Sequence, residues 1–461
     1  MKKIAKITLF LMFLFIFPAI SFACGEVVFD DVPYVSSLET SQKIVERVDT
    51  SRDYMLRNIT LKMKLKTINT YKYLGQYGKD GQTVRDEIVT TLGKLTDNPS
   101  VAIIEKTRYV DDKKISYEKY TYSHAMLDAV KTRSYLYSYV EQYNEDGEIE
   151  THDYNRTNYN HSTTDLISIY NEAVPVIKAN YVDSVSEKEF EGIKYYKLTS
   201  DIDGLESIKN IFAVDSNLCN NNNYQLFAKQ NLNDYVKPFS CEVGLKNYSG
   251  SEYEYITYST LNYKIEDRDR NVYLIASSKT ELIEYGESVL SSTPENKDEY
   301  TVYGFIKTMK DKNYVIYETA NPTNRTEYMQ YTVADVEDGY SIVEKRFVPG
   351  SPTEVKNYFY SNSEAKWYEL NVSNKIKTEK SSGLALDYIN FDFDQEGEIT
   401  NDEGVYSFKD KTNPANEITI SLADGEIFSA TTNSNTIYVV EYGTDIEKLG
   451  LVTSLEGFSA S

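Results

Sequence analysis

Residues 59–66 read Ile-Thr-Leu-Lys-Met-Lys-Leu-Lys, in which apolar side chains alternate strictly with Thr or Lys. Because successive side chains of a strand point to opposite faces, this stretch predicts a β-strand with one buried face. A helix signal precedes it. Ser36-Ser37-Leu38-Glu39 has the Ser-x-x-Glu spacing of a capping box. The apolar residues that follow fall on one helical face: Leu38, Ile44, Val45 and Val48.

The same order of signals recurs in the middle of the chain. Ser278-Lys279-Thr280-Glu281 repeats the capping box, 22 residues before Tyr300, as Ser36 stands 23 residues before Ile59. Its predicted helix face comprises Leu282, Ile283, Val289 and Leu290. Predicted strands then cover 300–309, 313–319 and 327–336. We also expect helices over 83–95 and 164–179.

This repetition predicts an α+β protein, mainly antiparallel β, in two tandem domains. We expect each domain to pack a helix on a curved, incomplete β-barrel. The domains would span residues 24–270 and 271–461. Three near-identical turn signals support hairpins, because Gly accepts a positive φ. They are Asp146-Gly147-Glu148-Ile149, Glu396-Gly397-Glu398-Ile399 and Asp424-Gly425-Glu426-Ile427.

Residues 1–23 have the pattern of a bacterial export signal. A basic start with Lys2, Lys3 and Lys6 precedes the apolar run 7–20, which is shorter than the roughly 20 residues of a membrane span. Ser21-Phe22-Ala23 then predicts cleavage before Cys24, so we expect an extracytoplasmic protein.

Cys24 leaves two interpretations open. Bacterial lipoproteins carry a lipid on a Cys in this place, and Ala23 fits that signal, but Phe22 and Ser21 depart from it. The protein is then either lipid-anchored at the cell envelope or secreted with an unmodified Cys24.

Composition narrows the partners. The 461 residues carry a net charge of −22, which becomes −25 once the three lysines of the signal are removed. So acidic a chain is not expected to bind nucleic acid, or an anionic membrane except through a lipid anchor. The 42 Tyr fit a strand-rich protein, although an AT-rich genome also favours Tyr codons.

Two internal cysteines, Cys219 and Cys241, are a candidate disulfide, because an exported protein meets no reducing environment. The bond would stabilise the fold by roughly 3 kcal/mol in the chain-entropy model. Two buried free thiols are the alternative.

Two segments resemble the LolA/LolB-like carrier fold, which also occurs in RseB-like and LppX-like lipoproteins. They are Glu191-Gly192-Ile193-Lys194-Tyr195-Tyr196-Lys197-Leu198 and the hairpin 419–427. The resemblance implies an open sheet curved around a helix, with an apolar cavity that carries or senses lipids or lipidated chains. No functional residue carries over, because the matching positions are structural.

Catalytic patterns are scarce. The chain has three histidines, His124, His152 and His161, so residues beyond 161 cannot form a Ser-His-Asp triad. No nucleotide-binding, metalloprotease or hydrolase-elbow motif occurs. We therefore expect a non-catalytic protein without a cofactor.

One stretch fits an EF-hand calcium loop at residues 392–403, with Gly397 at its sharp turn. Its acidic candidates are Asp392, Asp394, Glu396, Glu398 and Glu403. A plain hairpin turn is the alternative, since the residues after Glu403 alternate like a strand rather than a helix.

Two functions remain as hypotheses. The first is an envelope protein that binds an apolar ligand, a lipid or a lipidated partner in a LolA-like cavity. The second is a surface interaction protein, an adhesin or scaffold, whose β-domains are packed and hold no ligand cavity.

Overall fold

The structure of the protein is a computed structural model. It describes residues 29–58, 62–74, 81–93, 100–126, 132–158, 182–199, 235–247, 253–266, 272–286, 290, 294–319, 326–381, 393, 397–423, 425–432, 435–443 and 450–461. The export signal 1–23, Cys24 and the predicted helix 164–179 lie outside these residues.

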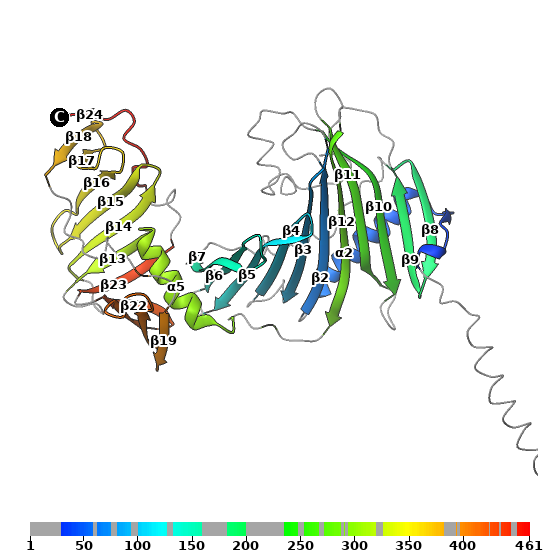
Figure 1. Cartoon of the computed structure of the whole chain (residues 1–461), viewed down its shortest axis with the longest axis horizontal. Helices are drawn as coiled ribbons and strands as arrows, with labels where there is room; N and C mark the ends of the chain where they lie inside the picture. The colour runs from blue at the N-terminus through cyan, green and yellow to red at the C-terminus, as the bar shows by residue number, and fades with distance from the viewer. Residues whose placement is uncertain are drawn as a thin grey trace, which may run out of the picture. The chain divides into compact units, whose positions relative to one another are not determined.

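The described strands form two large open sheets (Figure 1). The first has the order β1-β8-β9-β10-β11-β12-β2-β3-β4-β5-β6-β7. Its strands are β1 (Val35–Ser36), β2 (Lys62–Tyr73), β3 (Thr83–Gly93), β4 (Ser100–Val110), β5 (Lys113–Met126), β6 (Thr132–Tyr143), β7 (Ile149–Asn158), β8 (Ser184–Phe190), β9 (Ile193–Thr199), β10 (Tyr235–Asn247), β11 (Glu254–Glu266) and β12 (Val272–Gly286).

The second sheet has the order β19-β20-β21-β22-β23-β13-β14-β15-β16-β17-β18-β24. Its strands are β13 (Tyr314–Glu318), β14 (Tyr328–Val336), β15 (Gly339–Phe347), β16 (Glu354–Ser361), β17 (Lys366–Asn371), β18 (Ile376–Lys380), β19 (Gly397–Asp402), β20 (Val405–Asp410), β21 (Glu417–Ala423), β22 (Glu426–Thr432), β23 (Asn435–Tyr442) and β24 (Ser459–Ala460).

The two sheets repeat one topology. Six consecutive strands, β2–β7 or β13–β18, lie in chain order, and the five later strands, β8–β12 or β19–β23, lie on the other side of the first of them. A helix precedes each set of six: α2 (Ser41–Asn58) and α5 (Lys297–Lys310). The predicted fold class is therefore confirmed: mainly antiparallel β, with a helix for each open sheet.

By compactness the chain divides into two units, and strand β2 contributes to both. The first unit comprises Met1–Asn58, Asn69–Gln82 and Asn171–Ile283. The second comprises Ile59–Ile68, Thr83–Tyr170 and Glu284–Ser461.

In the first unit, α2 packs against β11 on one face of the sheet (Figure 1). The helix buries Ile44, Val45, Val48 and Met55. The register pairs Leu198 with Cys241 and Tyr196 with Val243, and directly opposed side chains share a face. The Tyr196 hydroxyl reaches α2 through Arg47, so this apolar face is the one that the helix covers.

The opposite face of the same strands holds the N-terminal segment. The 3-10 helix η1 (Phe29–Asp31) places the Phe29 ring 4.8 Å from the ring of Tyr195. The Tyr195 ring in turn lies over Gly244, where an added Cβ would come within 2.9 Å of it. This segment continues into β1, which pairs with β8.

In the second unit, α5 is enclosed on two sides. Val302, Phe305, Ile306 and Met309 are fully buried in one core with strands β13–β15 and β20–β23. On the other side, the Tyr300 ring lies 5.1 Å from Tyr154 of β7. Gly304 admits the β7 backbone, because a Cβ there would stand 2.9 Å from the Arg156 amide nitrogen.

The enclosure of α5 explains an incorrect prediction. Residues 300–309, predicted as a strand, belong to α5. A helix buried all round shows no amphipathic period, and its aromatic and β-branched residues favour a strand on local preference alone.

The helix predicted over 278–290 is also wrong, because residues 272–286 form β12. Ser278 and Glu281 pair with β11 instead of capping a helix. The alternation of buried Leu274 and Ala276 with exposed Ile275 is the strand signal there. Residues 83–93, predicted as part of a helix, form β3.

The turn signals had different outcomes. Gly147 and Gly425 have positive φ between β6 and β7 and between β21 and β22, as predicted. Gly397 instead begins β19, and the turn to β20 lies at Glu403-Gly404, where both residues have positive φ.

Candidate functional site

A groove of about 490 Å³ lies between α2 and the start of β11 in the first unit. Helical periodicity places Lys43, Glu46, Arg47 and Thr50 along one largely exposed stripe of α2, and Ser51 beside them is buried. The groove is lined by Glu39, Lys43, Glu46, Arg47, Thr50, Ser51, Tyr253 and Glu254.

Arg47 is the fixed point of this groove. Its Nε and Nη2 donate to the two carboxylate oxygens of Glu254 at 2.9 and 2.5 Å. Its Nη1 donates to Glu39 at 2.8 Å and to the Tyr196 hydroxyl at 2.6 Å. The hydrogen bond to Glu254 is the main reason why the pKa of Arg47 is raised. A guanidinium held by a bidentate carboxylate is rigid, so the groove has a preorganised polar wall.

An aromatic stack forms the other side. The rings of Tyr54 and Tyr253 are parallel within 11°, with their centroids 4.5 Å apart. Tyr253 is 52% exposed, so part of its ring meets solvent. Aromatic contact area and fixed polar groups together suit a binding site.

The comparisons with known proteins do not identify a family. No family model matches the sequence, and no curated protein matches it. A crystal structure from Nitrosomonas europaea, assigned as AttH, has 7% identity and a TM-score of 0.16 over 85% of this chain and 94% of that one. The tesB protein of Mycobacterium avium subspecies paratuberculosis has 9% identity and a TM-score of 0.09 over 54% and 88%. At TM-scores this low, neither structure indicates the fold or the function of this chain.

The predicted cysteine sites are only partly visible. Cys24 and Cys219 lie outside the described residues, so the lipid anchor and the disulfide stay predictions. Cys241 is fully buried on β10, and burial raises the pKa of its thiol to about 12.

The predicted calcium ligands are not gathered in the described part of the chain. Asp392, Asp394 and Glu396 lie outside it. Glu398 lies near the start of β19, and Glu403 follows its last residue in the turn to β20, roughly 16 Å further along at about 3.3 Å per residue. The extended strand between these two residues does not curl around one ion. Calcium binding by residues 392–403 stays a prediction, because three of the five candidates lie outside the described residues. Among the described residues, no group of three or more His, Cys, Asp or Glu could hold a metal.

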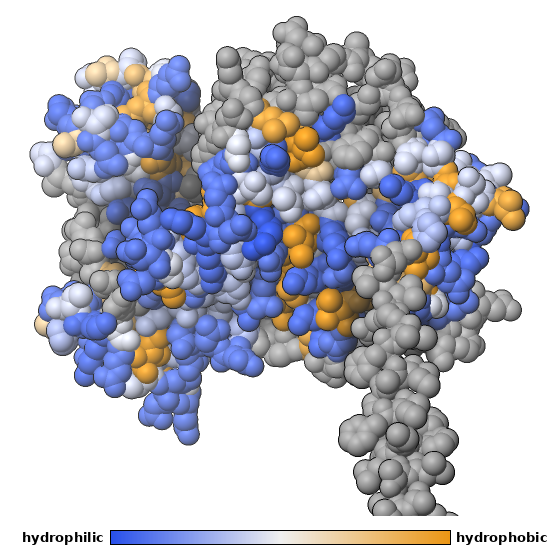
Figure 2. Space-filling view, turned by 45° about the vertical axis from the view of Figure 1, so that its right-hand side comes forward, coloured by the Kyte–Doolittle hydropathy of each residue, from blue (hydrophilic) through white to orange (hydrophobic). Residues whose placement is uncertain are grey.

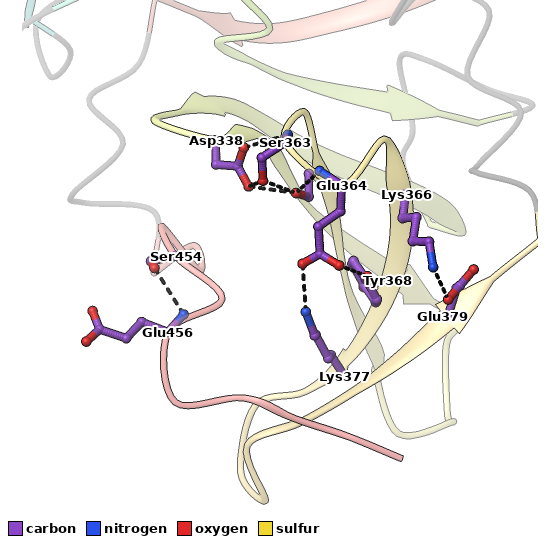
Figure 3. A network of polar contacts seen from close by, with 10 residues as sticks. Asp338, Ser363, Glu364, Lys366, Tyr368, Lys377, Glu379, Ser454 and Glu456 are labelled. Carbon is purple, nitrogen blue, oxygen red and sulfur yellow. Dashed lines mark hydrogen bonds and ion pairs between the residues drawn. The ribbon is translucent and has the colours of Figure 1, made fainter.

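A second polar network lies at one end of the second sheet (Figure 3). Asp338 accepts hydrogen bonds from the Ser361 hydroxyl at 2.6 Å and from the amide and hydroxyl of Ser363 at 2.8 and 2.9 Å. These bonds lower the pKa of Asp338. Glu364 accepts from Tyr368 at 2.5 Å and from Lys377 at 2.9 Å. These bonds join the β14–β15 turn to the β16–β17 turn and tie Lys377 of β18 to the latter, so the network fixes the hairpins.

No described helix is long and apolar enough to cross a membrane. On the face drawn in Figure 2, hydrophilic residues predominate among the coloured ones, and hydrophobic residues form small separate groups. Scattered apolar residues of this kind are usual for a protein surface.

Sequence reasoning missed the groove. The polar stripe on α2, formed by Lys43, Glu46, Arg47 and Thr50 at spacings of three and four residues, was a signal that could have been noticed. The partners Tyr253 and Glu254 lie some 200 residues away, and nothing local in the sequence links them to α2.

Proposed function

We propose that the protein is a non-catalytic, exported interaction protein of the bacterial cell envelope, with packed β-domains. The enclosure of α5 supports this proposal. Its apolar residues meet a filled sheet core on one side, and Tyr300 and Gly304 meet strand β7 on the other. A carrier of apolar ligands would need open apolar space beside such a helix.

The lipid-carrier function is the second candidate. In its favour, α2 lies across one face of an open sheet in the first unit. Against it, the groove beside α2 is lined mostly by charged and hydroxyl groups. An acyl chain would displace water from these groups without replacing its hydrogen bonds, which is unfavourable.

Native mass spectrometry of the protein purified from its own cells distinguishes the two. We expect the mass of the chain from Cys24 onward without a co-purified lipid. A stoichiometric, non-covalently bound lipid would establish the carrier instead. The same spectrum shows whether Cys24 is acylated.

Localisation needs its own control. A Cys24→Ser variant removes the acceptor sulfur and leaves the rest of the export signal intact. If Cys24 carries the anchor, the variant moves from the membrane fraction to the medium. Wild type and variant both in the medium would show that the protein is secreted without the anchor.

A further inference from the structure

The groove between α2 and β11 contains an unusual tyrosine. Among the described residues, nine large apolar or aromatic side chains are exposed, and Tyr253 is the only aromatic one. It stacks on Tyr54, which fixes the orientation of its ring. A ring held in this way is a preorganised flat surface, because it loses little conformational entropy when a ligand binds.

The walls of the groove are equally fixed. Arg47 makes four hydrogen bonds, to Glu254, Glu39 and Tyr196. Each carboxylate has lone pairs beyond those used by Arg47. Lys43, Glu46 and Thr50 add exposed polar groups one helical turn apart. Rigid donors and acceptors around an apolar ring suit a ligand with many hydroxyl groups and an apolar face.

Charge balance disfavours ionic ligands. The groove has three carboxylates and two cations, and two of the carboxylates already bind Arg47. An anion would meet the three glutamates, and a cation at Glu39 or Glu254 would have to compete with the Arg47 guanidinium. An uncharged ligand is not repelled by the glutamates and does not compete with Arg47.

We infer that this groove binds an uncharged oligosaccharide, with a sugar ring stacked on Tyr253 and its hydroxyls bonded to Glu46, Lys43 and Glu254. Its volume of about 490 Å³ lies in the range of small-molecule sites. The inference rests on the proposed function, because only an exported protein meets envelope saccharides. It adds the chemical class of the partner.

Isothermal titration calorimetry of the full exported chain tests it. The probes are the hexamer of N-acetylglucosamine and maltohexaose, each titrated to about 10 mM, which is enough to saturate a site with a dissociation constant of about 1 mM. We expect saturable binding of at least one. Tyr253→Ala should weaken that binding by about tenfold or more, and Tyr253→Phe should change it less than about twofold, because the platform is kept.

Two further variants serve as a negative control and as a second test of the groove. Tyr438→Ala removes a half-exposed tyrosine of the second sheet and should leave binding unchanged. Lys43→Ala alters an exposed helix position that tolerates Ala, and should weaken binding severalfold even if Tyr253→Ala disturbs the fold.

Absence of saturable binding to both saccharides, or equal binding by the wild type and a folded Tyr253→Ala variant, would overturn the inference. The lipid content measured by native mass spectrometry is independent of this titration. If no saccharide binds and no lipid co-purifies, the saccharide ligand is rejected and the proposed interaction function is not.

Discussion

Tyrosine hydroxyls donate hydrogen bonds to carboxylates at many positions in this acidic chain. Tyr117 donates to Glu105 at 3.0 Å, and Tyr139 donates to Glu141 at 2.7 Å. The chain has 71 Asp and Glu against 49 Lys and Arg, so cations cannot pair with every acid. Phenol groups partly replace them, which gives the high tyrosine content a structural role.

Two Tyr→Phe substitutions should therefore have opposite effects. Tyr139→Phe removes a donor to Glu141 and should lower the free energy of unfolding by about 1 kcal/mol. Tyr314 is fully buried, and its hydroxyl has no partner within the described part of the chain. Tyr314→Phe should leave stability unchanged or raise it by about 1 kcal/mol. Urea unfolding measures both, and losses of equal size would contradict this role.

Glu242 is a second residue with a distinct chemistry. It lies on β10 and accepts a hydrogen bond from Tyr34 of the N-terminal segment. Burial, with a smaller contribution from Asp30, raises its pKa to about 7 from 4.5. Between these two pH values the folded protein holds a proton that the unfolded chain has released.

Because folded Glu242 binds its proton more tightly, its contribution to stability falls as pH rises from about 4.5 to about 7 and then stays low. Glu242→Gln cannot ionise. The free energy of unfolding of the variant minus that of the wild type should therefore be larger at pH 8 than at pH 4.5. Urea unfolding at both pH values gives the comparison. A stability difference independent of pH would show that Glu242 titrates normally.

Among the elements, α5 depends on the absence of a side chain at Gly304. In most exposed helices, Ala at such a position would add about 1 kcal/mol of stability. Here the added Cβ would stand 2.9 Å from the Arg156 backbone nitrogen, so the helix and β7 must separate.

Gly304→Ala should consequently lower the free energy of unfolding by about 1 to 3 kcal/mol, the usual cost of overpacking. Lys310→Ala, at the exposed end of the same helix, is the matched control and should have little effect. Fluorescence of the single Trp367 on β17 reports unfolding of this unit. A stabilised Gly304→Ala variant would show that β7 does not press on the helix.

The two ends of the described chain each cover a sheet edge. β1 pairs with β8, and the C-terminal β24 pairs in parallel with β18. Val452, Leu455 and Phe458 pack on a small core of Phe359, Tyr368 and Leu370. The pairing involves two residue pairs at each edge, so each cover blocks pairing with other chains over a short stretch.

Phe458→Ala should loosen the C-terminal cover. Half-burial of this ring predicts a loss of about 1 to 2 kcal/mol, and amides of β18 should exchange faster with solvent. Glu456→Ala, exposed in the same segment, is the control. Unchanged exchange in β18 would show that the segment does not protect the edge.

For the whole molecule, the net charge of −22 sets the response to salt. Screening weakens self-repulsion, so raising NaCl from about 0.05 M to about 0.5 M should raise the Tm by a few degrees. At matched ionic strength, CaCl₂ and MgCl₂ should act equally if residues 392–403 form a hairpin. A larger rise with CaCl₂ alone would establish a calcium site there.

The sequence by itself determined the strand-rich class and the first helix, whereas the helix predicted for the second copy of the repeat was placed on residues that form β12. Alternation in residues 59–66 and the apolar face from Ile44 to Val48 report burial on one side, which is a local property. The two Asp-Gly turns were predictable from local sequence as well, because Gly has no Cβ and accepts the positive φ that a tight turn requires.

Tertiary structure decided where the second helix lies and where the groove forms. Residues 300–309 are helical because a sheet core and strand β7 bury them from both sides, a cause that local periodicity does not encode. Arg47 and Glu254 meet across some 200 residues because α2 packs on β11. Long-range burial and charge pairing depend on how elements pack, and the pattern within one element does not reveal its partner.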